Sequence, residues 1–123
     1  MLYTSFVSET AVAEVSKGLM ARGINPQNYA SGDWWLYELE VSLDAVLDLT
    51  DPVVVSQLQI NSQSLVQADA AYARQIGKQA AEAGYQTVIV PSAAYPGEKN
   101  LVIFLSAATR YPTIKSSRAA QLS

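Results

Sequence analysis

The stretch YQTVIVPSAAYPGEKNLVIFLS, Tyr85–Ser106, decides the fold class of this 123-residue chain. Its two apolar runs, TVIV and LVIFL, predict two buried strands. The intervening AYPGEK contains Pro96-Gly97, a dipeptide that favours a turn. Directly upstream, the Ala-rich segment AAYARQIGKQAAEAG predicts a helix that ends at Gly84. A helix followed by two buried strands predicts a domain that mixes α and β structure.

The segments further upstream add more elements of both kinds. LYTSFV at Leu2–Val7 alternates apolar and polar side chains and predicts a strand. WWLYELEVSL predicts another, with Trp35, Tyr37, Leu39 and Val41 alternating against a wetter face of Trp34, Leu36, Glu38 and Glu40. VLDL predicts a short strand, and Pro52, capped by Thr50 or Asp51, predicts a helix to about Leu58, although VVV suits a strand equally well. INPQNYASGD predicts a loop.

These elements predict one α+β domain at residues 1–109, with a mixed or antiparallel sheet and flanking helices. The polar residues 110–123 are expected to form a C-terminal tail. Half of the residues are apolar and only 15% are charged, as in globular proteins. The longest apolar runs are too short to span a bilayer. With no secretory signal pattern at Met1, a cytoplasmic protein without membrane contact is expected.

Charge and composition exclude several kinds of function. The formal charge is −3, and the eight Lys and Arg residues are scattered, which argues against direct nucleic-acid binding. The chain has no Cys and no His, so thiol nucleophiles, Ser-His-Asp triads and thiolate or HExxH metal sites are excluded. Any chemistry must come from carboxylates, hydroxyls, amides, Arg and Lys.

The helix predicted after the first strand carries one unusual carboxylate. Ser8 is the expected N-cap and Gly23 the expected stop. Val12, Val15 and Leu19 form the expected core stripe of this helix. Glu14 lies more than a third of a turn away, among small residues that leave room for close approach. Alternatively, Glu14 is a solvated side chain that pairs with Lys17.

Three further residue groups have both a structural and a functional interpretation. Tyr3 is either a core or rim aromatic or part of a binding site. Ser92, which follows Pro91 at the end of a strand, is either ordinary turn chemistry or a site residue. The paired tryptophans of Asp33–Trp35 either bury at least one ring in the core or form a partner surface.

Three separated blocks of the chain together resemble one family. LYTSFVSETAVAEV, LYELEVSLDAVLDLTD and AAEAGYQTVIVPSAAYPGEKNLVIF are similar, in order and character, to the RES domain family, over nearly all of Leu2–Leu105. That family supplies the toxin half of bacterial RES–Xre toxin–antitoxin pairs. The resemblance implies a compact ADP-ribosyltransferase-like fold and an enzyme that consumes NAD+ by phosphorolysis, hydrolysis or ADP-ribosyl transfer. NAD+ would be the substrate, and no metal is required.

The resemblance also implies residue roles. Glu14 would be the catalytic glutamate, Tyr3 an aromatic of the nicotinamide pocket and Ser92 the signature serine that binds substrate. The family's signature Arg would lie upstream of Tyr3, and we expect that the chain lacks the N-terminal segment with this Arg. The implied partner is a cognate Xre-type antitoxin, and a homo-oligomer stays open. The alternative is a truncated, catalytically silent module that acts only as a binding or interaction protein.

Overall fold

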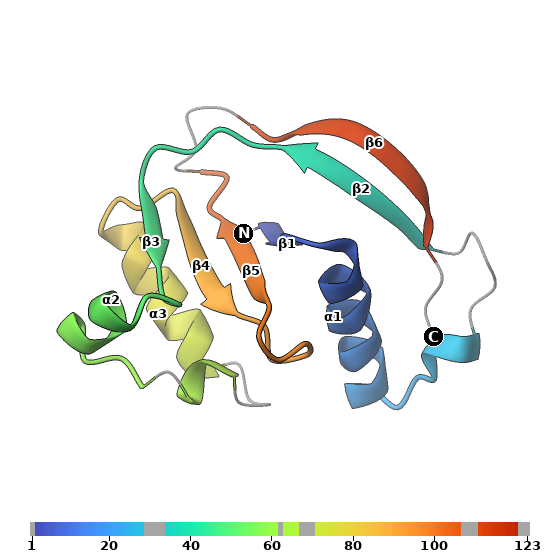
Figure 1. Ribbon diagram of the computed structural model, residues 1–123, viewed down its shortest axis with the longest axis horizontal. Helices are drawn as coiled ribbons and strands as arrows, with labels where there is room; N and C mark the ends of the chain where they lie inside the picture. Colours follow the sequence, from blue (N-terminus) through green and yellow to red (C-terminus); the bar gives the residue numbers. More distant parts are fainter. Residues whose placement is uncertain (1, 29–33, 62, 67–70, 107–110, 121–123) are drawn as a thin grey trace.

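The chain folds into an α+β domain with a mixed sheet, as expected from its sequence (Figure 1). The computed structural model describes residues 2–28, 34–61, 63–66, 71–106 and 111–120. The elements in chain order are β1 (Leu2–Ser5), α1 (Ser8–Ala21), η1 (Pro26–Asn28), β2 (Trp34–Glu40), β3 (Val46–Asp48), α2 (Pro52–Gln57), η2 (Ser64–Val66), α3 (Ala71–Glu82), β4 (Thr87–Pro91), β5 (Lys99–Ile103) and β6 (Thr113–Ala120). Within these residues, no helix has the length and apolarity needed to cross a membrane.

The main sheet has the strand order β1-β5-β4-β3. Strands β4 and β5 form an antiparallel hairpin, and Gly97 in their connection has a φ of +89°, which favours glycine. The N-terminal strand β1 pairs antiparallel with β5, whereas β3 pairs parallel with β4. The two strands predicted from the opening stretch are therefore the centre of the sheet, and β1 reaches them from the other end of the chain.

The hydrophobic core lies between one face of this sheet and the helices α2, α3 and η2. Val88 and Val102 are directly opposite each other in the β4–β5 register, so their side chains share the face that these helices cover. The buried members of the core are Leu49, Leu65, Ala80, Val88, Val102 and Phe104. Helix α3 ends before Gly84, whose φ of +96° permits the turn into β4.

Among the described residues, β2 and β6 form a second, two-stranded sheet, which arches across the side of the domain that carries β1 and α1 (Figure 1). The tail prediction is wrong for residues 113–120, which pair along the whole of β2. Only Ala120 of β6 is buried. A strand with nearly all side chains in solvent lacks the apolar alternation by which a sequence reveals strands, which explains the error.

The predicted faces of β2 are partly exchanged. Trp35 and Tyr37, expected on the drier face, are 53% and 57% exposed, whereas Trp34, Leu36 and Leu39 are half-buried. The register of β2 with β6 shifts between Glu38 and Leu39. Such a bulge breaks the two-residue alternation, so the side that is buried changes along the strand.

The start and the apolar stripe of α1 also differ from expectation. Ser8 is the first helical residue, and Val7, in an extended conformation, is the N-cap without a side-chain cap. Ser8 Oγ donates instead to Glu9 Oε2 at 3.3 Å. Of the predicted stripe, Leu19 is buried, but Val12 and Val15 are half-buried and line a groove described below. The predicted stop is confirmed, with Gly23 at a φ of +77°.

Candidate functional site

The Glu14 carboxylate is held by three donors from the β4–β5 hairpin. Ser92 Oγ and the Ala94 backbone N–H both donate to Oε1 at 3.1 Å. Asn100 Nδ2 donates to Oε2 at 3.0 Å. The sequence separations of these pairs are 78, 80 and 86 residues, so the fold alone brings them together. A half-buried carboxylate with three directed donors is an organised site rather than a solvated side chain.

Ser92 has a second function within the same hairpin. Its hydroxyl oxygen accepts from the Tyr95 backbone N–H at 3.1 Å, and its own backbone N–H donates to the Glu98 carbonyl at 2.9 Å. The residue is only 4% exposed. The serine therefore stabilises the turn, as one of the two interpretations from the sequence expected, and it also donates to Glu14.

Helix α1 contacts this hairpin at a second point. Lys17 Nζ donates to the Ala93 carbonyl at 3.1 Å. Lys17 follows Glu14 by three positions on the helix and so lies on the same side. The ion pair between Glu14 and Lys17, which the sequence left open as an alternative, does not form. Both side chains instead reach across to consecutive residues of the hairpin, and they fix the helix against it.

Asn100 is the member of the site that the sequence did not reveal. It opens the apolar part of β5, is 8% exposed, and stands opposite Ser5 in the register of β1 and β5. Ser5 Oγ donates to Asn100 Oδ1 at 2.6 Å. A buried amide inside a strand was the available signal, but its partners become visible only when β1 is placed beside β5.

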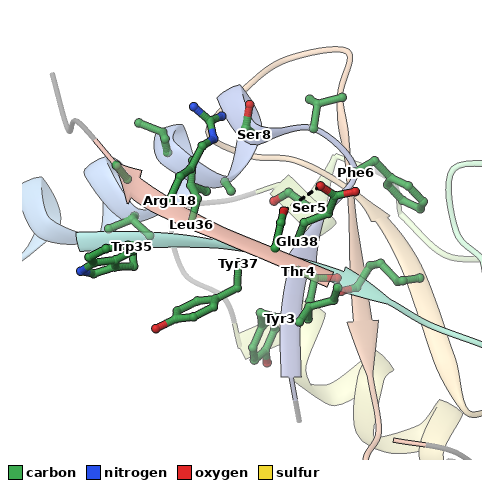
Figure 2. A pocket seen from close by; sticks show the side chains of 18 of the residues that line it. Tyr3, Thr4, Ser5, Phe6, Ser8, Trp35, Leu36, Tyr37, Glu38 and Arg118 are labelled. Atoms are coloured by element: carbon green, nitrogen blue, oxygen red, sulfur yellow. Dashed lines mark hydrogen bonds between the residues drawn. The ribbon is translucent and has the colours of Figure 1, made fainter. Parts of the chain in front are cut away.

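Tyr3 belongs to a different part of the surface. It is 64% exposed and lies in the wall of a groove of about 730 Å³ between β1, the start of α1 and the β2–β6 sheet (Figure 2). Trp35, Tyr37 and Phe6 also line it, and Trp35 and Phe6 are more than half exposed. Of the two paired tryptophans, then, Trp34 is half-buried and Trp35 contributes to this surface.

Ser5 connects the groove to the Glu14 site. Neither Glu14 nor Ser92 is among the described residues of the groove lining, but Ser5 is. Through its bond to Asn100, Ser5 connects the groove wall to the carboxylate. The structure thus unites Glu14 with Ser92 and leaves Tyr3 on the neighbouring surface.

The site offers hydrogen-bonding groups rather than metal ligands. In the parts of the chain that the structure describes, no group of three or more acidic side chains is placed to hold a metal ion. Polar hydroxyl and amide groups next to a carboxylate can orient a ligand that carries hydroxyls, such as a sugar. The aromatic faces of the groove can stack on a flat ring.

Comparisons with known proteins agree on the family and the fold. A family model described as RES domain matches residues 1–123. The structure resembles a chain in the crystal structure of the MbcT–MbcA toxin–antitoxin complex of M. tuberculosis, with a TM-score of 0.79 and 22% identity. The match covers 98% of this chain and 66% of that one, so the chain spans about two thirds of its structural relative. No curated protein matches.

Proposed function

Because the chain belongs to the RES domain family, we propose that it is the toxin of a toxin–antitoxin pair, that it consumes NAD+, and that Glu14 is its catalytic carboxylate. The structural relative is part of a complex described as toxin–antitoxin, which supports the antitoxin as the partner. The proposal further assigns that partner to the Xre type. Cytoplasmic NAD+ would be the substrate.

The reaction would break the bond between the nicotinamide nitrogen and C1′ of the ribose. Nicotinamide leaves with the bonding electron pair, and positive charge develops on the ribose as an oxocarbenium ion. Phosphate, water or a protein side chain then supplies the electron pair for the new bond to C1′. A carboxylate that accepts from a ribose hydroxyl orients the sugar and stabilises this charge where it forms.

The three-donor arrangement around Glu14 is the observation that carries this proposal. A carboxylate has about four lone-pair sites, and three of those on Glu14 are occupied by Ser92, Ala94 and Asn100. No other contact of the described residues occupies the remaining site, which is available for a substrate hydroxyl. A preorganised charge in a half-buried position loses little energy to rearrangement during the reaction, and this is the main requirement of electrostatic catalysis.

Tyr3 and Ser92 have distinct roles in the proposal. The ring of Tyr3 would stack on nicotinamide in the groove, whose volume of about 730 Å³ lies within the range of ligand pockets. Ser92 would contribute to substrate binding at the Glu14 end of the site. The Ser92 hydroxyl donates to Glu14 and accepts from the Tyr95 N–H, which leaves one lone pair on its oxygen. Because Ser92 is 4% exposed, a direct contact requires that substrate reaches this lone pair.

Nicotinamide release tests the proposal. Purified protein is incubated with NAD+, with and without phosphate, beside Glu14→Gln and the matched control Glu9→Gln. Glu9 is exposed on the same helix, so its variant makes the same chemical change outside the site. We expect Glu14→Gln to lower the rate by about 100-fold or more and Glu9→Gln to leave it unchanged. Equal rates in all three proteins would refute the role of Glu14.

A catalytically silent module that only binds a partner is the second candidate. The exposed aromatic rings of Trp35, Tyr37 and Phe6 along one groove favour it, because aromatic residues are enriched at interfaces. This candidate predicts no nicotinamide release from folded protein, with binding of the antitoxin weakened by Trp35→Ser. Release that depends on Glu14 would exclude it.

A further inference from the structure

We propose that Asn100 is a positioning residue that fixes the reactive oxygen of Glu14, and that Ser5 in turn fixes Asn100. The inference rests on the proposed role of Glu14. It concerns two residues that no sequence signal selected, one on β5 and one on β1, which the sheet brings to adjacent positions.

The orientation of the Asn100 amide follows from its two neighbours. A carboxylate can only accept hydrogen bonds, so the amide must turn its NH2 group toward Glu14 Oε2, 3.0 Å away. The carbonyl oxygen then points toward Ser5 Oγ, which donates to it at 2.6 Å. Both contacts are satisfied by this orientation. The reversed amide would place its carbonyl oxygen against Glu14 Oε2 and lose that contact, whereas Ser5 Oγ could then accept from the NH2 group. The residue is 8% exposed, so water replaces neither contact readily.

The two oxygens of Glu14 are not equivalent. Oε1 accepts from both Ser92 Oγ and the Ala94 N–H, which occupies its two lone-pair sites. Among the contacts of the described residues, Oε2 accepts only from Asn100. The free lone pair is therefore on Oε2, and Asn100 decides where it points. Ser92 acts on the opposite oxygen, as well as on the turn through Tyr95.

The Ser5–Asn100 contact also links this oxygen to the groove. Ser5 lines the groove wall, and its neighbour Tyr3 lies two positions along the same strand, on the same face (Figure 2). A ligand in the groove that moved β1 would move Ser5 and, through Asn100, the Oε2 atom. Positioning by Asn100 thus couples the groove with the carboxylate.

Asn100→Asp is the most direct test because it keeps the shape of the side chain and replaces the NH2 donor with an acceptor. We expect kcat for nicotinamide release to fall by about 10- to 100-fold, while KM for NAD+ changes by less than about threefold because Asn100 does not touch substrate. Asn25→Asp is the matched control. Asn25 is exposed and its side chain only accepts a bond from Gln27 N, which an aspartate also accepts.

The pH profile separates positioning from a general structural effect. The carboxyl introduced by N100D can donate a hydrogen bond to Glu14 only when it is protonated. The deficit in kcat relative to wild type is therefore expected to shrink as the pH falls from about 8 to about 5. Ser5→Ala keeps the Asn100 NH2 group as a donor to Glu14 but removes the contact that orients the Asn100 amide. It is therefore expected to lower kcat by less than N100D. A wild-type kcat in N100D, or a deficit that is constant across this pH range, would overturn the inference.

A measurement without turnover distinguishes failure of this inference from failure of the proposed function. The Asn100 side-chain NH2 resonances of wild type, Glu14→Gln and Ser5→Ala are compared by 1H–15N NMR. Slow exchange with water in wild type, lost on Ser5→Ala, supports the contact. Fast exchange in wild type overturns the inference whatever the enzymatic result. Slow exchange in a folded but inactive wild type would refute the proposed function. Asn100 would then orient the Glu14 carboxylate without a role in catalysis.

Discussion

Substitution of Ser92 should destabilise the protein as well as disturb the contacts of Glu14. Ser92→Ala removes one hydroxyl that donates to Glu14 Oε1 and accepts from the Tyr95 N–H, both at 3.1 Å. Each bond contributes about 1 kcal/mol to stability. Glu14 keeps its contacts with Ala94 and Asn100, so no charge is left without a donor. We therefore expect the free energy of unfolding to fall by about 2 kcal/mol.

The same loss can be read as a change in melting temperature. An unfolding entropy of about 2.1 cal/mol/K per residue gives about 0.26 kcal/mol/K for 123 residues. A loss of about 2 kcal/mol then lowers Tm by about 8 °C. Urea and thermal unfolding followed by circular dichroism give both quantities. Ser56→Ala is the matched control because Ser56 is exposed on α2, and its variant should stay within about 0.5 kcal/mol of wild type.

The result that refutes this reasoning is an unfolding free energy of Ser92→Ala equal to that of Ser56→Ala. It would mean that the Ser92 hydroxyl is solvated and does not bridge α1 and the hairpin. Ser92 would then be available for substrate alone, and the three-donor arrangement around Glu14 would be reduced to two.

Two further predictions concern stability away from the site. Leu49 is 1% exposed in the main core, so Leu49→Ala should lower the free energy of unfolding by about 3 kcal/mol through lost burial and a residual cavity. Leu58→Ala is the control in the same urea titration, because the Leu58 side chain is 51% exposed. Equal losses of stability in the two variants would contradict the position of the core. Asp51 caps α2 through a 2.9 Å bond from the Val53 N–H, so Asp51→Ala should cost about 1 kcal/mol and Asp51→Asn much less. A similar loss in both variants would show that charge and not the cap is responsible.

The sequence predicts best the elements whose signals are local. Helix α3 with its terminal Gly84 and the strands β4 and β5 follow from composition and turn residues within one stretch, and the structure confirms them. Of the two predicted caps before Pro52, Thr50 and Asp51, the structure has Asp51, and the segment forms the helix α2 rather than a strand. Each of these decisions is made by neighbours in the chain.

The errors occur where distant parts of the chain decide. Strand β6 forms because β2 offers it a partner, not because its own polar sequence favours a strand. The bulge at Glu38 depends on that pairing and changes which side of β2 is buried. The small residues around Glu14 left two interpretations open, and only the family resemblance implied its role. Its donors come from a hairpin 78 or more residues away, and Asn100 was not selected at all.

The order of elements along the chain has a consequence for biosynthesis. The earliest strand, β1, pairs with β5, and Thr4 donates to the Leu101 carbonyl across a separation of 97 residues. Strand β2 likewise cannot form its sheet until β6 has been synthesised. Contacts this distant close slowly because the intervening chain must first be ordered. On the ribosome, Glu14 is synthesised 78 to 86 residues before the donors that hold its carboxylate. A nascent chain therefore carries the glutamate without a site until the β4–β5 hairpin has been synthesised.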